Sequence, residues 1–124
     1  MQWLAIALGG ALGSMVRYAA VSWLTPSTGL RFPLGTFAVN LLGAFLIGVV
    51  YVLLTKKFAL APEWRLFFMT GLLGGFTTFS AFSLETLQLL QSGHWLTAIS
   101  YALGSVVACL LAVFIAVLLT GKLV

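Results

Sequence analysis

The hydropathy pattern divides the chain into four long apolar runs separated by short polar stretches. The runs cover residues 3–24, 34–55, 66–90 and 95–119. Each run reaches or exceeds the ~20 residues that an α-helix needs to cross the hydrocarbon core of a bilayer. The pattern therefore predicts an all-α membrane protein with four transmembrane helices, which form a single domain over residues 1–124.

Composition supports a membrane setting and leaves little chain outside the bilayer. Hydrophobic residues occupy 62% and charged residues 6% of the 124 positions, whereas roughly a quarter of a typical soluble domain is charged. The connections between the runs are short and carry turn formers such as Pro33, Pro62 and Gly93. The chain shows no metal-ligand cluster and no nucleophile with a neighbouring base, so an enzyme is not expected.

The basic residues are scattered along the chain, which does not indicate a nucleic-acid-binding surface. Their distribution between the two sides instead predicts an orientation in the membrane. With four spans, both termini and the central connection lie on one side of the membrane. That side would carry four of the six basic residues: Lys56, Lys57, Arg65 and Lys122. The other side would carry Arg31, so the positive-inside rule predicts cytoplasmic termini.

A positive charge lies inside the first run. Gly9, Gly13 and Arg17 recur every four residues and share one helical face. Arg17 could extend its side chain to the nearer headgroups. It could equally stand at the wall of a water-filled vestibule and attract anions, because ionisable residues within spans usually face a cavity or a pathway.

Weakly polar side chains follow one face of the second and fourth runs. Asn40 lies one turn after Thr36, and the fourth run carries a stripe in steps of four residues: Thr97, Tyr101, Ser105 and Cys109. These groups could join helices by hydrogen bonds or could solvate a passing ion. Glu85 is the acidic residue within the third run, and we expect it to be protonated or bound to hydroxyls or Arg17.

The third run contains the stretch "GLLGGFTTFSAF", residues 71–82. Gly74 and Gly75 weaken a helix just before two β-branched residues, Thr77 and Thr78. One interpretation is a break in the helix, whose freed carbonyl groups would need protein, a wet cavity or a cation. The other is close helix packing, with the threonines bonded back to the preceding turn.

Two phenylalanines at the end of this stretch have a spacing that places them on one helical face. Phe79 and Phe82 lie three residues apart. Such a pair usually packs against other helices. The edge of a phenyl ring is electropositive, however, so the two rings could also attract a small anion.

Three segments resemble the signature blocks of the CrcB/Fluc fluoride channels in order and spacing. They are "GGALGSMVRY" (residues 9–18), "GTFAVNLLGAFLIG" (residues 35–48) and "GLLGGFTTFSAFSLE" (residues 71–85). The resemblance covers essentially the whole chain. It implies a passive fluoride channel of the bacterial inner membrane. It also implies a homodimer of two antiparallel copies, with two fluoride pathways and a structural Na⁺ on the two-fold axis.

The resemblance also assigns residue roles. Backbone carbonyls of Gly74 and Thr77 would bind Na⁺, and the ring edges of Phe79 and Phe82 would contact fluoride. Arg17 would lie in an electropositive vestibule. The remaining pathway residues would offer an amide or a hydroxyl: Asn40, Thr78, Ser80, Ser83, Tyr101 and Ser105.

Three features depart from this family pattern. Ala81 stands where the family commonly has Thr or Ser, and Cys109 replaces a hydroxyl that often continues the polar stripe. The uneven loop charges also conflict with dual insertion, which favours a weak bias.

Another small membrane protein fits the four-helix pattern, namely a dual-topology multidrug or cation antiporter. Such a transporter would need a carboxylate in its first helix to exchange cations and protons. This chain has Arg17 there, which carries the opposite charge. A scaffold subunit, in which glycines and phenylalanines only pack, is a third interpretation.

Overall fold

The computed structural model describes residues 1–25, 29 and 31–124, and every regular element in this part of the chain is a helix. Four helical segments are long and apolar enough to cross a membrane: Gln2–Leu24, Leu34–Lys57, Pro62–Gln91 and Trp95–Leu123. The prediction of an all-α fold with four helices able to span a membrane is confirmed for the described residues.

The second and third of these segments are not uniform helices. The elements are α1 (Gln2–Leu24), α2 (Leu34–Val52), the π-helical turn η1 (Leu53–Lys57), α3 (Pro62–Arg65), the π-helical stretch η2 (Leu66–Leu73), α4 (Gly74–Phe76), α5 (Phe79–Gln91) and α6 (Trp95–Leu123). The third segment therefore consists of four successive pieces. Wider π-type turns often occur next to functional sites, which directs attention to this segment.

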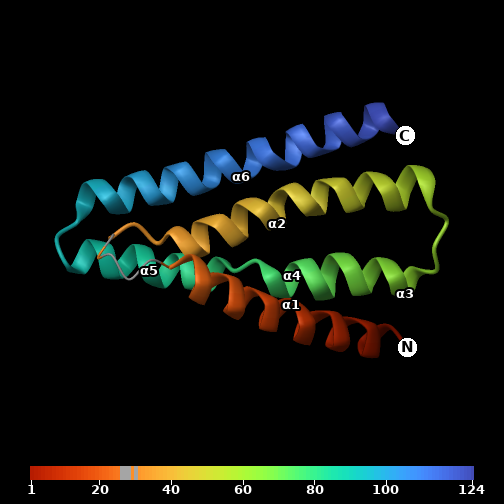
Figure 1. The fold of residues 1–124 in the computed structure, drawn as a ribbon, viewed down its shortest axis with the longest axis horizontal. Helices are drawn as coiled ribbons and strands as arrows, with labels where there is room; N and C mark the ends of the chain where they lie inside the picture. The colour runs from red at the N-terminus through yellow and green to blue at the C-terminus, as the bar shows by residue number, and fades with distance from the viewer. Residues whose placement is uncertain (26–28, 30) are drawn as a thin grey trace.

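The helices lie side by side along one direction (Figure 1). Helix α2 lies between α6 and the line formed by η2 and α4, whereas α5 packs directly on α6, and α1 packs against η2 and α4. Both termini and the connection between η1 and α3 lie at the same end of the bundle (Figure 1). This arrangement gathers Lys56, Lys57, Arg65 and Lys122 at that end.

Glycines bring α1 into backbone contact with the third segment. A Cβ added at Gly9 would collide with the carbonyl oxygen of Phe67, and one added at Gly13 would collide with that of Leu72. A Cβ at Gly71 would lie 2.9 Å from the Cα of Gly9. Small residues spaced in this way let membrane helices approach closely. The same face of α1 carries Arg17 one turn further on.

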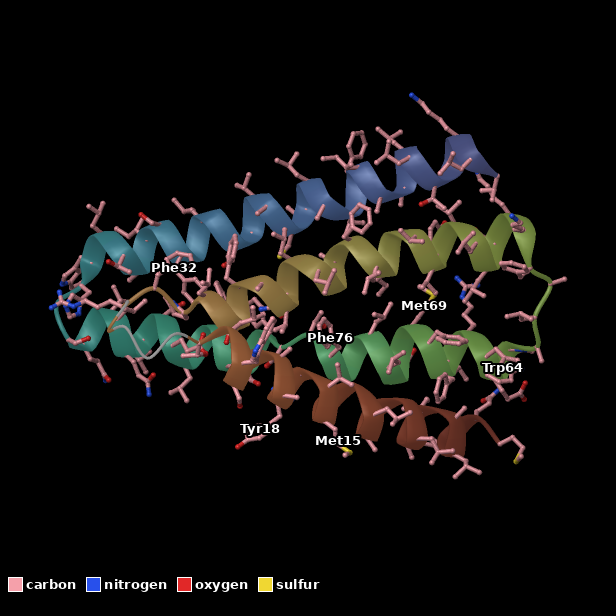
Figure 2. All side chains as sticks on the ribbon, viewed as in Figure 1. Met15, Tyr18, Phe32, Trp64, Met69 and Phe76 are labelled. Carbon is pink, nitrogen blue, oxygen red and sulfur yellow. The ribbon has the colours of Figure 1, made fainter. Side chains whose placement is uncertain are left out.

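Few side chains are fully enclosed, and many large apolar ones lie on the outside of the bundle. Tyr101, Val39 and Val52 are the largest fully buried side chains. Met15 and Tyr18 project outward from α1 (Figure 2), and both are mostly exposed. Lipid or a second protein surface can cover such side chains, so this exposure agrees with a multi-pass membrane protein.

Candidate functional site

The helix of the third segment is interrupted at Thr77 and Thr78. Helix α4 ends at Phe76 and α5 begins at Phe79. Thr77 has φ −87° and ψ 158°, and Thr78 has φ −150° and ψ 121°, so both residues are extended. Two β-branched residues favour this conformation. The glycines before them lower the cost of ending a helix there.

Each threonine caps one of the two helix ends. The hydroxyl of Thr77 donates to the carbonyl oxygen of Leu73 at 3.1 Å, which closes the last turn of α4. The hydroxyl of Thr78 accepts from the N–H of Ala81 at 3.2 Å and forms the N-cap of α5. A threonine N-cap satisfies one of the free N–H groups that begin every helix. The interruption is therefore locally stabilised by its own side chains.

A side chain from α2 satisfies the backbone of Thr78. The Nδ2 of Asn40 donates to the carbonyl oxygen of Thr78 at 3.0 Å, and its Oδ1 accepts from the N–H of Thr78 at 2.8 Å. In a continuous helix this N–H would donate to the carbonyl oxygen of Gly74. Asn40 therefore replaces a helical hydrogen bond and leaves the Gly74 carbonyl without its usual donor.

A side chain from α1 reaches the same interruption. The Nε of Arg17 donates to the carbonyl oxygen of Gly75 at 2.9 Å, and the side chain is half-buried. In a continuous helix, Gly75 would accept from the N–H of Phe79. Arg17 is therefore directed at the interruption and not at the headgroup end of α1.

A groove of about 420 Å³ lies between α2, α6 and the interruption. Seven of the residues predicted from the sequence line it: Asn40, Gly74, Thr77, Thr78, Phe79, Phe82 and Ser105. Its other lining residues include Gly43 and Cys109. Residues from three parts of the chain thus meet at one concave surface, as ligand sites between helices do.

The two predicted phenylalanines form one wall of the groove. The ring centroids of Phe79 and Phe82 lie 5.4 Å apart with a 41° angle between the ring planes. Phe79 is 76% exposed, whereas Phe82 packs on the ring of Tyr101 at 5.1 Å. One ring is therefore held by the bundle, and the other lies open at the edge of the groove.

Ser105 supplies a hydroxyl whose hydrogen-bonding capacity is unused. Its side chain is 6% exposed, and its Oγ is the buried polar side-chain atom that finds no partner in residues 1–25, 29 and 31–124. A buried hydroxyl usually bonds to protein or water, and each exception needs an explanation. Ser105 also lines the groove, with its Oγ enclosed just behind the groove surface.

The remaining predicted residues do not line this groove. The hydroxyl of Ser80 bonds to that of Thr78 at 3.2 Å, and the hydroxyl of Ser83 donates to the carbonyl oxygen of Phe79 at 2.9 Å. Tyr101 is fully buried behind Phe82, and Arg17 lies on the α1 side of the interruption. Each of these four residues contacts a residue of the groove or one near the interruption, but does not itself line the groove.

Glu85 is bound to two hydroxyls, one of the arrangements expected from the sequence. Its Oε1 accepts from the hydroxyl of Thr36, and its Oε2 accepts from that of Tyr101, both at 2.7 Å. The sequence did not reveal that Thr36 and Tyr101 would be the partners. The contact between Gly43 and Thr77 was also not evident from the sequence. Gly43 lies three residues after Asn40, however, so the two residues share one face of α2.

The fold and the groove define a class of protein, a small four-helix membrane protein whose polar groups gather at an interrupted helix. A family model described as "CrcB-like protein, Camphor Resistance (CrcB)" matches residues 4–117. The chain belongs to this CrcB family.

Similar proteins carry one functional name, "Fluoride-specific ion channel FluC". The protein of that name from Saccharophagus degradans is 54% identical over 123 residues, which cover 98% of this chain and 91% of the relative. The one from Thermus thermophilus is 50% identical over 99% of this chain and 96% of its own length. The one from Acidobacterium capsulatum is 43% identical over 124 residues, which cover 100% of this chain and 99% of the relative.

Proposed function

We propose that this chain forms a fluoride-selective channel through which cytoplasmic fluoride leaves passively, down its electrochemical gradient. The observation that carries the proposal is the groove, because Asn40, Phe79, Phe82 and Ser105 line it together. The names of the similar proteins support the same function. These names describe a channel, so the proposal assigns no enzyme activity to the chain.

The groove offers the kind of contacts that a strongly hydrated anion needs. A selective pore replaces the ion's water shell with several weak interactions, and binding must remain reversible for conduction. Ring edges of Phe79 and Phe82 attract an anion weakly. The unpartnered hydroxyl of Ser105 can donate to it. None of the described residues that line the groove is acidic, so no carboxylate repels the ion there.

Other hydroxyls extend this pathway beyond the groove. From Thr78, which lines the groove, Ser80 and Ser83 follow along the start of α5, and Tyr101 stands behind Phe82. The present hydrogen bonds of the Thr78, Ser80 and Ser83 hydroxyls are short-range and join neutral groups. Such bonds can be exchanged for a bond to a passing ion at modest cost.

The channel is a homodimer of two antiparallel copies in the bacterial inner membrane. The exposed ring of Phe79 and the open side of the groove support this arrangement, because a second copy would enclose both. The interruption at Thr77 and Thr78 then lies at mid-membrane depth. Non-helical backbone is tolerated at that depth where it is buried in protein or lines a cavity.

The proposed dimer holds a structural Na⁺ through the backbone carbonyls of Gly74 and Thr77. Both residues line the groove, and the carbonyl of Gly74 lacks its helical donor because Thr78 N–H donates to Asn40. Carbonyl oxygens at broken membrane helices are suitable ligands for Na⁺. When bound, Na⁺ supplies a fixed positive charge that lowers the electrostatic cost of an anion in low-dielectric surroundings.

The antiporter interpretation is not favoured. The similar proteins are named as channels. Helix α1 also places a guanidinium, not a carboxylate, beside the interrupted helix.

Fluoride efflux from liposomes tests the function. Vesicles containing the protein are loaded with KF, placed in low-K⁺ medium and treated with valinomycin, and a fluoride electrode records release. We expect rapid fluoride release, no release from protein-free vesicles, and slow release with Phe82→Ile. If fluoride stays inside while a proven fluoride channel empties matched vesicles, the chain is not a fluoride channel.

Labelling tests the antiparallel arrangement, which the uneven loop charges oppose. Lys57→Cys combined with Cys109→Ala leaves a single thiol at the basic end of the bundle. We expect a membrane-impermeant maleimide to label this thiol from both sides of the membrane. Labelling from one side alone would contradict dual insertion.

A further inference from the structure

Arg17 makes a contact that an anion-attracting charge does not need. Its Nε, and not a terminal nitrogen, donates to the carbonyl oxygen of Gly75 at 2.9 Å. We propose that Arg17 is a positioning residue, which holds the N-terminal side of the interruption just as Asn40 holds its C-terminal side. This inference rests on the proposed channel function, because the interruption borders the groove.

Two of the helical hydrogen bonds that the interruption removes involve the backbone groups bound by Asn40 and Arg17. In a continuous helix the N–H of Thr78 would donate to Gly74, and the N–H of Phe79 would donate to Gly75. In the structure the N–H of Thr78 donates to Asn40, and the carbonyl of Gly75 accepts from Arg17. Two other helices thus satisfy two of the freed backbone groups, the N–H of Thr78 and the carbonyl of Gly75, which would otherwise be costly inside a membrane.

Close packing fixes where Arg17 can reach. A Cβ added at Gly75 would lie 2.7 Å from the carbonyl oxygen of Gly10 and 3.2 Å from the backbone nitrogen of Ser14. The backbones of α1 and α4 are therefore in direct contact at this height. Arg17 lies one turn beyond Gly13 on the same face, so its stem needs to span only a short gap.

Two substitutions separate the position of the donor from the charge. The Nε2 of glutamine is separated from Cα by as many bonds as the Nε of arginine, so Arg17→Gln keeps an N–H donor at that place and removes the charge. The Nζ of lysine lies one bond further out, so Arg17→Lys keeps the charge and misplaces the donor. A positioning role favours Gln, whereas electrostatic attraction favours Lys.

Hydrogen–deuterium exchange reads the interruption directly, without fluoride or Na⁺. The purified protein and its variants are compared in detergent, and exchange is followed in the peptide that covers residues 74–81. We expect Arg17→Lys and Arg17→Ala to exchange roughly tenfold faster than the unaltered protein, as expected when a hydrogen bond is lost, and Arg17→Gln to exchange more slowly than both. Peptides from α6 should be unchanged in all variants, which separates local loosening from unfolding.

The same variants are then compared for fluoride efflux from liposomes. We expect Arg17→Gln to retain more flux than Arg17→Lys, in the order of the exchange rates. The inference is overturned if Arg17→Lys exchanges like the unaltered protein, if Arg17→Gln exchanges as fast as Arg17→Ala, or if Lys retains more flux than Gln. Absence of flux in the unaltered protein would instead refute the channel function, and the exchange rates would still decide the role of Arg17.

Discussion

The phenol of Tyr101 donates a 2.7 Å hydrogen bond to Oε2 of Glu85, and this bond joins α6 to α5. Thr36 of α2 donates to the other carboxylate oxygen at the same distance. A carboxylate within a membrane-spanning segment thus receives two neutral donors from two other helices. Paired in this way, Glu85 serves as a junction of three helices and lies outside the groove.

Removing one donor from this junction should weaken the fold. Tyr101→Phe keeps the ring that packs on Phe82 but leaves Oε2 of Glu85 without its hydrogen bond. We expect the free energy of unfolding to fall by about 1 to 3 kcal/mol, the cost of an unsatisfied buried acceptor.

Unfolding by denaturing detergent, followed by circular dichroism, measures this loss. Tyr18→Phe is the matched control, because Tyr18 is 77% exposed and should tolerate the change. Equal unfolding midpoints for Tyr101→Phe and Tyr18→Phe would show that the Glu85 junction contributes nothing.

The contact between Gly43 and Thr77 offers a double-mutant test of how α2 meets the interruption. A Cβ at Gly43 would collide with Cγ2 of Thr77, and its next neighbour would be Cδ1 of Phe76 at 3.3 Å. Gly43→Ala should therefore lower the free energy of unfolding by about 1 to 3 kcal/mol through overpacking.

Thr77→Ser removes the colliding methyl group, so the double variant should recover most of the stability. Gly104→Ala is the control, because a Cβ there meets no atom within 4 Å. The measured coupling between the two substitutions isolates the contact. Strictly additive losses would mean that these two residues do not touch in the folded protein.

Much of this architecture could be predicted from the sequence because its signals are local. Apolar runs of membrane-spanning length identify the four helices. The Gly74-Gly75 and Thr77-Thr78 pairs indicate a weakened helix, but by themselves they leave a break and close helix packing as alternatives. The spacing of Phe79 and Phe82 places both rings on one face, and they form one wall of the groove.

The partners of the charged residues could not be predicted, because they depend on which helix faces meet. Glu85 could have paired with Arg17 by charge alone, yet the structure pairs it with Thr36 and Tyr101. Arg17 reaches the interruption because glycines bring α1 into backbone contact with the third segment. Hydropathy in a uniformly apolar chain carries little information about such contacts, since lipid-facing and buried faces look alike.

Substitution of Ser105 should change stability and fluoride efflux in opposite directions. Its buried hydroxyl finds no partner among the described residues, so Ser105→Ala removes an unsatisfied polar group and should raise the free energy of unfolding by about 1 to 3 kcal/mol. The same change removes a donor from the groove and should slow fluoride efflux.

Ser100→Ala is the matched control on the same helix, because Ser100 is exposed and lies outside the groove. Both unfolding and efflux should be unaffected by it. A Ser105→Ala protein with unchanged efflux would remove this hydroxyl from the fluoride pathway.

Asn40→Asp should stop the channel without preventing dimer formation. Aspartate can still accept from the N–H of Thr78, but it presents an oxygen where the amide now donates to the carbonyl oxygen of Thr78. It also places a negative charge on the wall of the groove, which repels an anion. We expect efflux to fall at least about tenfold, the factor that corresponds to the loss of one hydrogen bond of about 1.4 kcal/mol. Gln88→Glu makes the same amide-to-acid change at an exposed position of α5 and should leave efflux intact. Equal efflux from Asn40→Asp and Gln88→Glu, with both proteins dimeric by size-exclusion chromatography, would exclude Asn40 from the pathway.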